Sequence, residues 1–283
     1  MPKKKVIVVG AGPGGLTAAM LLASKGYAVE IFERDGVVGG RNRAIKVGDF
    51  TFDMGPTFLM MKFILEEMFE LTGRSVYDYL QIESIDPLYR LQFGNGKTLL
   101  PTRDRAEMKA QIDALFPGNA KGYDRLMAYE RGKFDKLVPC LQVPYASLRD
   151  FLSPRLLKAL PVLDTHLSLY RHLGRFFDDD DLKTAFTFQA KYLGMSPWQC
   201  PATFSIISYI EHAGGIHHPI GGLNQISAAM AKVLEEEGGR IHLDRPVREL
   251  RVRNGRAVGV RLESGDDVEA DYVVLNADFA HAM

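Results

Sequence analysis

A glycine-rich turn between two short apolar segments constrains the fold of this chain more than any other feature. Residues 6–9 form a β-branched run that is typical of a buried parallel strand. Gly10, Gly12 and Gly15 follow with the spacing G-x-G-x-x-G, and a helix is predicted over residues 14–25. In such a turn the glycines permit a tight bend, the approach of a pyrophosphate and close packing of the helix on the strand. The sequence therefore predicts a dinucleotide-binding βαβ unit.

The next predicted strand ends at an acidic residue and is followed by a second glycine motif. Glu33 stands where a carboxylate can accept hydrogen bonds from both ribose hydroxyls, and it would repel a 2′-phosphate. The segment ERDGVVGGR then supplies the glycine pair Gly39 and Gly40, together with Arg34 and Arg41, which can neutralise phosphate charge. The alternative for this second motif is an ordinary solvated loop. Its combination with the first motif favours FAD over NAD.

Composition and charge exclude several classes of protein. The 283 residues can bury a large core, and the balance of 35 basic and 35 acidic residues gives no reason to expect nucleic acid as a partner. Cys140 and Cys200 do not form a C-x-x-C pair, which fits a reducing cytoplasm. Lys3 to Lys5 precede an apolar stretch that imitates a signal peptide, but the glycine turn interrupts it, so export is not expected. No apolar run reaches the length of a membrane-spanning helix.

The order of the predicted elements indicates a helical domain inserted into a nucleotide-binding domain. Residues 1–72 and 214–283 are predicted as the two halves of the FAD-binding domain, and residues 73–213 as a substrate and membrane-association domain. Asp278 ends the motif VVLNAD at the cofactor edge of the sheet, and only five residues follow it. The expected fold class is α/β: an FAD/NAD(P)-binding Rossmann-like domain of the glutathione-reductase type, with a mostly helical insert and its C-terminal part missing.

The other predicted elements alternate between helices and strands. They are strands over residues 28–32, 49–57, 240–243 and 272–276, a hairpin over 88–100, a β-meander over 247–271, helices over 62–71 and 223–237, and a largely helical stretch over 103–213.

With these pieces in view, the chain resembles the bacterial phytoene desaturase family, which comprises carotenoid desaturases within the amine-oxidase-like flavoprotein superfamily. The resemblance runs nearly end to end. It rests on GAGPGGLTAAMLLASKGY, ERDGVVGGR, FDMGPTF, FQAKYLGMSPWQCPATFSIISYIEHAGGIHHPIGG and ADYVVLNAD. The first two motifs are common to the superfamily, whereas FDMGPT and YLGMSP followed by PIGG favour the carotenoid branch. Family members are longer, and their C-terminal segment contains another flavin-contacting glycine motif.

The motifs and the resemblance together predict a set of FAD-binding residues. Gly55, Pro56 and Thr57 are expected near the isoalloxazine, and the backbone of Val247 near the adenine. The full predicted set is Gly10, Gly12, Gly14, Gly15, Glu33, Arg34, Gly40, Arg41, Gly55, Pro56, Thr57, Val247 and Asp278.

The resemblance also implies a reaction. A hydrophobic polyene such as phytoene would be dehydrogenated repeatedly by hydride transfer to flavin, with quinone or oxygen as the electron acceptor. No catalytic base is identified. The alternatives are a carotenoid isomerase, ketolase or amine oxidase of the same superfamily, and a non-catalytic escort protein of the same fold that binds lipid or prenyl groups. The intact glycines and Glu33 argue against the escort protein.

Residues 145–177 interleave Leu, Phe and Tyr with basic side chains. Such a segment suits the surface of an anionic bilayer, and an ordinary helix face with solvated charges is the alternative. The protein is therefore expected to be cytoplasmic and peripheral to membranes. The basic residues are Arg149, Arg155, Lys158, Arg171 and Arg175.

Several other side chains allow two interpretations. One group could line a hydrocarbon tunnel, although core packing is the preferred interpretation for any single member: Phe50, Phe52, Phe58, Met60, Met61 and Phe63. His212, His217 and His218 lack nearby carboxylates at ligand spacing other than Glu211, so cavity lining is preferred to a metal site and no metal is expected. Residues 178–181 are predicted to cap a helix, and Trp198 to serve in packing.

Overall fold

The computed structural model describes residues 2–278, and the chain divides into two compact units. The sheet unit contains Met1–Ser84 and His217–Met283, and the helical unit contains Ile85–Ile216. Both breaks lie later in the chain than the domain boundaries predicted after residues 72 and 213. Each unit has a hydrophobic core of its own.

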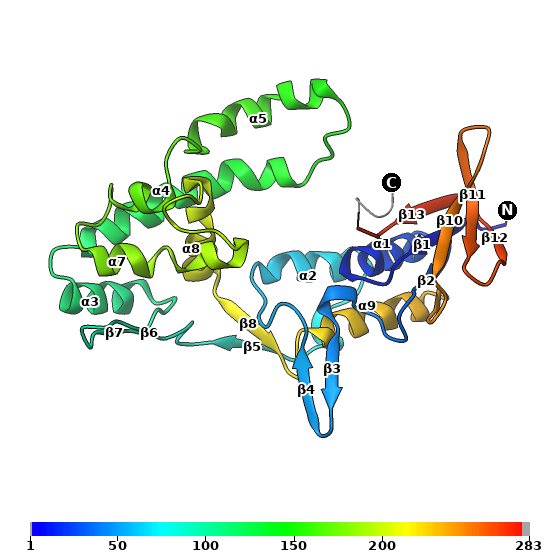
Figure 1. The fold of residues 1–283 in the computed structure, drawn as a ribbon, viewed down its shortest axis with the longest axis horizontal. Helices are drawn as coiled ribbons and strands as arrows, with labels where there is room; N and C mark the ends of the chain where they lie inside the picture. The colour runs from blue at the N-terminus through cyan, green and yellow to red at the C-terminus, as the bar shows by residue number, and fades with distance from the viewer. Residues whose placement is uncertain (1, 279–283) are drawn as a thin grey trace. The chain divides into compact units, whose positions relative to one another are not determined.

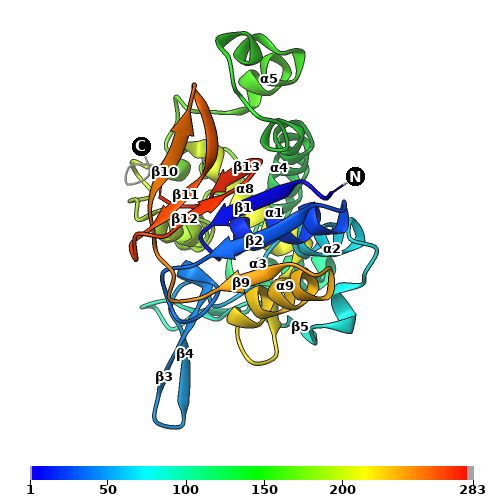
Figure 2. The ribbon, with the colours of Figure 1, turned by 90° about the vertical axis from the view of Figure 1, so that its right-hand side faces the viewer.

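The sheet unit is built on a parallel sheet of four strands in the order β13-β1-β2-β9, which can be followed from top to bottom in Figure 2. Its strands are β1 (Lys5–Val9), β2 (Ala28–Phe32), β9 (Arg240–His242) and β13 (Tyr272–Leu275). The predicted strands at these positions are confirmed. The sheet brings together segments from both ends of the sequence.

Two layers cover this sheet. The helices α1 (Pro13–Ser24) and α9 (Asn224–Glu236) pack on one face, where Val8 and Ile31 join their core cluster. The antiparallel meander β10 (Val247–Arg253), β11 (Arg256–Leu262) and β12 (Asp267–Glu269) packs on the other face, where Ile7 and Phe32 meet Val260. Successive side chains of a strand point to opposite faces, so a strand covered on both faces needs an unbroken apolar run. This requirement explains the composition of residues 6–9.

A two-stranded hairpin projects from the sheet unit (Figure 1). It pairs β3 (Ala44–Val47) with β4 (Phe50–Asp53), and Gly48 takes a φ of +59° in the turn between them. The strand at β4 was predicted from the sequence, and β3 was not. Core packing is the wrong interpretation for Phe50, Phe52 and Phe63, because all three side chains are exposed.

The sheet unit also contains a helix, a pair of strands and two short 3-10 segments. The helix α2 (Lys62–Glu70) is confirmed, and β5 (Ile82–Ile85) pairs with β8 (Ile216–Pro219). Short 3-10 segments are η1 (Gly40–Asn42) and η2 (Val76–Asp78).

The helical unit consists of the 22-residue helix α4, several shorter helices and a hairpin of two-residue strands. The predicted hairpin and the largely helical character of residues 103–213 are confirmed. The elements are β6 (Leu91–Gln92), β7 (Thr98–Leu99), α3 (Arg105–Leu115), α4 (Ala120–Leu141), η3 (Leu148–Leu152), α5 (Pro154–Ala159), η4 (Leu160–Val162), α6 (Leu169–Leu173), α7 (Asp180–Ala185), η5 (Phe188–Leu193), η6 (Ala202–Ser205), α8 (Ile206–Tyr209) and the π-helical η7 (Ile210–Gly214). Among residues 2–278, no helix combines the length and apolar character needed to cross a bilayer.

A buried ionic network ties α4 to the segments packed on it. The Nζ atom of Lys133 lies 3.2 Å from Oε2 of Glu130 and 3.3 Å from Oδ2 of Asp164, and Nε2 of His172 lies 2.9 Å from Oε1 of Glu130. Burial alone raises the pKa of Asp164, but a hydrogen bond from Tyr129 and the charges of Lys133 and His172 outweigh it, so the pKa falls below its ordinary value. Mutual pairing offsets much of the cost of removing these charges from water.

Two predictions about single positions can be checked in this unit. Asp179 caps α7 by accepting a hydrogen bond of 3.0 Å from the backbone N–H of Leu182, which confirms the capping role. Trp198 packs against the ring of Tyr170 with 5.5 Å between centroids, as predicted, but it does so at the surface and not in the core.

Candidate functional site

The glycine turn after β1 is packed too tightly to admit side chains. Gly10 takes a φ of +96°, and a Cβ atom there would lie 2.6 Å from the carbonyl oxygen of Asn276. A Cβ atom on Gly15 would overlap the carbonyl oxygen of Gly10. The turn leads directly into α1, whose first N–H groups have no partners within the helix and carry the positive end of its dipole. The arrangement forms a backbone cradle suited to a pyrophosphate.

Asn276 completes this cradle; the sequence placed the motif VVLNAD at the cofactor edge of the sheet, but the predicted site included only Asp278 of that motif. Its backbone N–H donates to the carbonyl of Val9 at 2.9 Å, and its Nδ2 atom donates to the carbonyl of Gly10 at 3.4 Å. Its Oδ1 atom lies 2.8 Å from the position that a Cβ on Gly14 would take. The available signal was topological: the carboxyl ends of adjacent parallel strands meet at one sheet edge, so the residue after β13 must lie beside the turn after β1.

Glu33 is buried at the end of β2, beside the same turn. Its Oε2 atom accepts a hydrogen bond of 2.6 Å from the N–H of Ala11, and its Oε1 atom accepts one of 3.0 Å from the N–H of Asp35. Each carboxylate oxygen can accept more than one hydrogen bond. Glu33 is thereby held rigidly where it can still receive the hydroxyls of a ribose.

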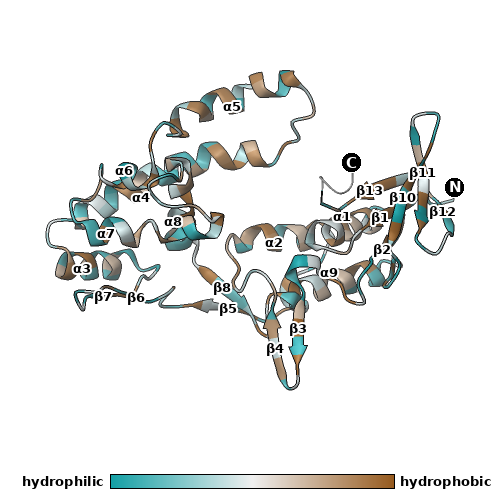
Figure 3. Cartoon of the chain, viewed as in Figure 1, coloured by the Kyte–Doolittle hydropathy of each residue, from teal (hydrophilic) through white to brown (hydrophobic). Residues whose placement is uncertain are grey.

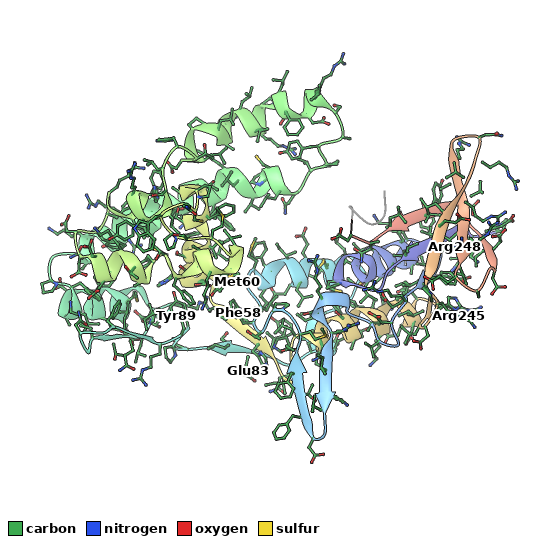
Figure 4. The ribbon with its side chains drawn as sticks, viewed as in Figure 1. Phe58, Met60, Glu83, Tyr89, Arg245 and Arg248 are labelled. Atoms are coloured by element: carbon green, nitrogen blue, oxygen red, sulfur yellow. The ribbon has the colours of Figure 1, made fainter. Side chains whose placement is uncertain are left out.

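The start of β10 lies next to Glu33. The N–H of Arg245 donates to the carbonyl of Glu33 at 2.8 Å, and Figure 4 shows Arg245 and Arg248 at this end of the strand. Val247, between them, is half-buried against the cluster that contains Phe32. The position is compatible with the predicted backbone contact of Val247 near the adenine.

The second glycine motif touches the first. The N–H of Gly39 donates to the carbonyl of Ala11 at 2.8 Å, and a Cβ atom on Gly40 would lie 3.3 Å from the Cα atom of Gly12. The structure therefore brings the two motifs together and argues against an ordinary solvated loop. Arg34 and Arg41 are both exposed at this place.

The segment predicted near the isoalloxazine is packed on the second motif. A Cβ atom on Gly55 would overlap the carbonyl oxygen of Arg41, so backbone meets backbone there. Pro56 and Thr57 follow with exposed surfaces. Asp278 lies two residues beyond Asn276, at the cofactor edge of the sheet.

The motifs FDMGPTF and HHPIGG, which are far apart in the sequence, are paired in space. Leu59 and His217 form an antiparallel bridge with hydrogen bonds of 2.7 and 2.9 Å. Nδ1 of His218 donates to the carbonyl of Thr57 at 3.0 Å, and the carboxylate of Asp53 accepts from the N–H of Leu223 at 3.2 Å. The two motifs therefore hold each other in place through these hydrogen bonds.

The predicted FAD-binding residues all lie in the sheet unit. Their arrangement fits an extended dinucleotide because it combines a backbone cradle, a buried carboxylate next to it and a second close approach of backbone at Gly55. The contacts of individual residues with FAD stay predictions.

The histidines considered as metal ligands are separated between the units. His212 belongs to the helical unit, where its ring stacks on Phe186 with 5.0 Å between centroids, whereas His217 and His218 belong to the sheet unit. Complete burial lowers the pKa of His212 to about 4. Within the described part of the chain, no three His, Cys, Asp or Glu side chains are grouped to hold a metal ion.

Comparisons with known proteins agree with this site. A family model described as flavin-containing amine oxidoreductase matches residues 13–283, which confirms a flavin, and hence the FAD prediction. The chain is 48% identical over 280 residues to a 4,4′-diapophytoene desaturase (4,4′-diapolycopene-forming) of Methylomonas sp, covering 99% of this chain and 55% of that one. It is 39% identical over 280 residues to a zeta-carotene-forming phytoene desaturase of Myxococcus xanthus, with 99% and 54% covered. The chain thus spans about half the length of these relatives, and their names confirm the resemblance to carotenoid desaturases.

Solved structures confirm the predicted fold class. A putrescine oxidase superposes with a TM-score of 0.61 at 20% identity, over 100% of this chain and 60% of that one. A Rab GDI from Plasmodium falciparum superposes with a TM-score of 0.60 at 13% identity, over 99% and 66%. At these identities the likeness establishes the fold alone.

We predict that Gly15→Ala weakens FAD binding at least tenfold, about 1.4 kcal/mol, because the new methyl group overlaps the carbonyl of Gly10 and displaces the turn. Titration of FAD fluorescence would measure the dissociation constant. Gly132→Ala is the matched control, since a Cβ atom there meets nothing within 4 Å. Equal dissociation constants for Gly15→Ala and the unmodified chain would contradict the prediction.

We predict that His212 makes the protein less stable as the pH falls from about 6.5 to about 4. Its folded-state pKa is about 4, below the ordinary value, so the unfolded chain binds the proton first and acid favours unfolding. The free energy of unfolding of the unmodified chain should therefore fall relative to that of His212→Phe over this range. Denaturant titrations at several pH values would measure the difference. The exposed His166, changed to Gln, serves as the control; an unchanged difference across the range would refute the prediction.

Proposed function

The chain belongs to the flavin-containing amine oxidoreductase family, and from this premise we propose that it functions in FAD-dependent carotenoid desaturation. The observation that carries the proposal is the close packing of the two glycine motifs, Gly40 against Gly12, in a chain 48% identical to a desaturase. The substrate would be phytoene or a related carotene, and quinone or oxygen would be the electron acceptor. The intact cradle and the buried Glu33 favour this enzyme over a lipid escort protein.

The residues of the sheet unit have separate tasks in this function. The N–H groups at the start of α1 and the cradle from Gly10 to Gly15 would hold the pyrophosphate, and Glu33 would hold the ribose. Gly55 would let the backbone come close to the ring system, and Arg41 would neutralise phosphate charge. FAD, when bound, supplies a hydride acceptor. Because conjugation stabilises charge that develops in the polyene, the protein contributes mainly positioning and exclusion of water.

The helical unit carries an exposed apolar surface beside basic residues. Leu148 is 87% exposed and Leu152 is 70% exposed, and Figure 3 shows hydrophobic (brown) segments in the α5 region. Basic side chains on the same stretch could contact anionic headgroups while the apolar ones enter the interface. A carotene dissolves in the bilayer, so peripheral binding would give the enzyme access to it. The exposed apolar residues are Leu141, Leu148, Phe151, Leu152, Leu157 and Leu160, and the basic ones are Arg149, Arg155 and Lys158.

Expression in cells that accumulate phytoene tests the catalytic proposal. We expect coloured polyenes when the chain is co-expressed with the part of the Methylomonas desaturase that it does not match, and little or none from residues 1–283 alone. Gly15→Ala, supplied with the same partner segment, should abolish pigment, and Gly132→Ala should not. Pigment extraction and chromatography give the measurement. Robust conversion by the chain alone would overturn the need for a partner, and equal pigment from Gly15→Ala would overturn the role of the cradle.

Sedimentation with liposomes tests the membrane proposal. The chain should sediment with vesicles that contain anionic lipid, and the triple variant Arg149→Glu, Arg155→Glu and Lys158→Glu should stay largely in the supernatant. The control reverses three exposed arginines of the sheet unit, Arg248, Arg253 and Arg256, and should sediment like the unmodified chain. Equal recovery of the unmodified chain in the supernatant with and without vesicles would disprove membrane binding.

A further inference from the structure

The hairpin β3–β4 has one face made entirely of apolar side chains. Ile45 pairs directly with Phe52, and Val47 pairs directly with Phe50. Directly paired residues of adjacent strands lie on the same face of a sheet, and alternate residues of a strand do so too. The four side chains therefore share one face, and the ring centroids of Phe50 and Phe52 are 6.3 Å apart. Their exposed fractions are 44% for Ile45, 60% for Val47, 69% for Phe50 and 55% for Phe52.

The opposite face of the hairpin is mainly polar, with Ala44 paired to Asp53 as its apolar member. Lys46 pairs with Thr51, and both side chains are exposed. Asp53, on the same face, accepts hydrogen bonds from the N–H of Leu223 and from Nδ2 of Asn224. The alternation of apolar and polar residues is that of a sheet with one face on a core and the other in water. Among residues 2–278 no layer covers the apolar face, and two-stranded sheets are marginally stable without one.

The ends of the hairpin are fixed to the cofactor site. Its first strand follows Arg41, its second strand precedes Gly55, and the backbone of these two residues is in close contact. The projecting hairpin seen in Figure 1 thus continues the predicted FAD-binding segments and is not a remote loop. Exposed Phe pairs on such a rigid support mark an interaction surface.

We propose that this face is covered by the polypeptide that corresponds to the unmatched part of the relatives, whether that polypeptide continues this chain or is a separate one. The match leaves 45% of the Methylomonas desaturase and 46% of the Myxococcus desaturase outside it, which is enough chain to supply a packed layer. The inference rests on family membership and not on the proposed catalysis.

Two other occupants fit the observations less well. Residues 44–53 contain Lys46 but also Asp49 and Asp53, so the hairpin has no excess of positive charge to attract an anionic bilayer. Four side chains also offer much less than the ~800 Å² per partner that a stable dimer of two copies requires. If the unmatched polypeptide also contacts other parts of this chain, the hairpin face is only a fraction of the interface and does not have to supply the full area by itself.

Thiol accessibility tests the proposal directly. Val47→Cys places a thiol on the apolar face and Lys46→Cys places one on the polar face, and the native Cys140 and Cys200 are buried and contribute little background. Each variant is labelled with a maleimide, alone and co-purified with the unmatched part of the Methylomonas desaturase. We expect the labelling rate of Val47→Cys to fall at least tenfold in the complex, and that of Lys46→Cys to change less than twofold. Equal rates for Val47→Cys with and without the partner, or failure of the two polypeptides to co-purify, would overturn the proposal.

A second pair of variants guards against a local effect of the cysteine. Phe50→Thr with Phe52→Thr keeps strand propensity but removes the apolar face, and should lower the recovery of the partner at least tenfold; Lys46→Gln with Thr51→Ser should leave it unchanged. Thermal unfolding checks that both pairs remain folded.

Protection of Val47→Cys by vesicles, or by raising the concentration of the chain alone, would show a lipid or a second copy as the occupant and would contradict the proposal. All measurements are made without added FAD, so a failed pigment assay and a failed protection assay are distinguishable.

Discussion

Close backbone packing at the carboxyl end of the parallel sheet is the constraint on which the rest of the sheet unit depends. The N–H of Gly10 donates to Phe32 at the end of β2, and the N–H of Asn276 after β13 donates to Val9 at the end of β1. The carboxylate of Glu33 fixes the turn by accepting a hydrogen bond from the N–H of Ala11. A side chain at Gly15 would force these strand ends apart, so the same packing that forms the cradle also fixes the register of the sheet.

Those parts of the fold that depend on local pattern were predictable from the sequence. Parallel strands buried on both faces require continuous apolar runs, so β1 was found from composition alone. The apolar run at β13 also indicated a strand, but it was expected to be buried, whereas β13 lies at the edge of the sheet with Tyr272 and Leu275 exposed. The glycine spacing and Glu33 then placed the cofactor site before any distance was known. The strand β3 was missed although it is as long as β4, which was found. Phe50 and Phe52 were assigned to a core because hydrophobicity alone does not say which polypeptide supplies the covering layer.

Other features depend on contacts between segments distant in sequence, and no local pattern encodes them. Lys133 is completely buried, although lysine is almost never fully buried without a partner. Glu130 lies three residues earlier in the same helix, but Asp164 comes from a segment distant in sequence. Asn276 is likewise an unremarkable residue in sequence, and only its position after β13 sets it against the glycine turn. Predicting either residue requires the topology first.

The hairpin β3–β4 is continuous in the chain with the second glycine motif, which packs on the cofactor cradle. The backbone runs from Gly40 through β3 and β4 to Gly55 and returns to the second glycine motif. The base of the hairpin is the close contact between the backbones of Arg41 and Gly55. A polypeptide packed on Phe50 and Phe52 would therefore restrict the backbone predicted to lie against the flavin ring. If that segment is ordered in advance, less conformational entropy is lost when FAD binds, so covering the hairpin would raise the affinity for FAD, and by linkage FAD would favour the covered state.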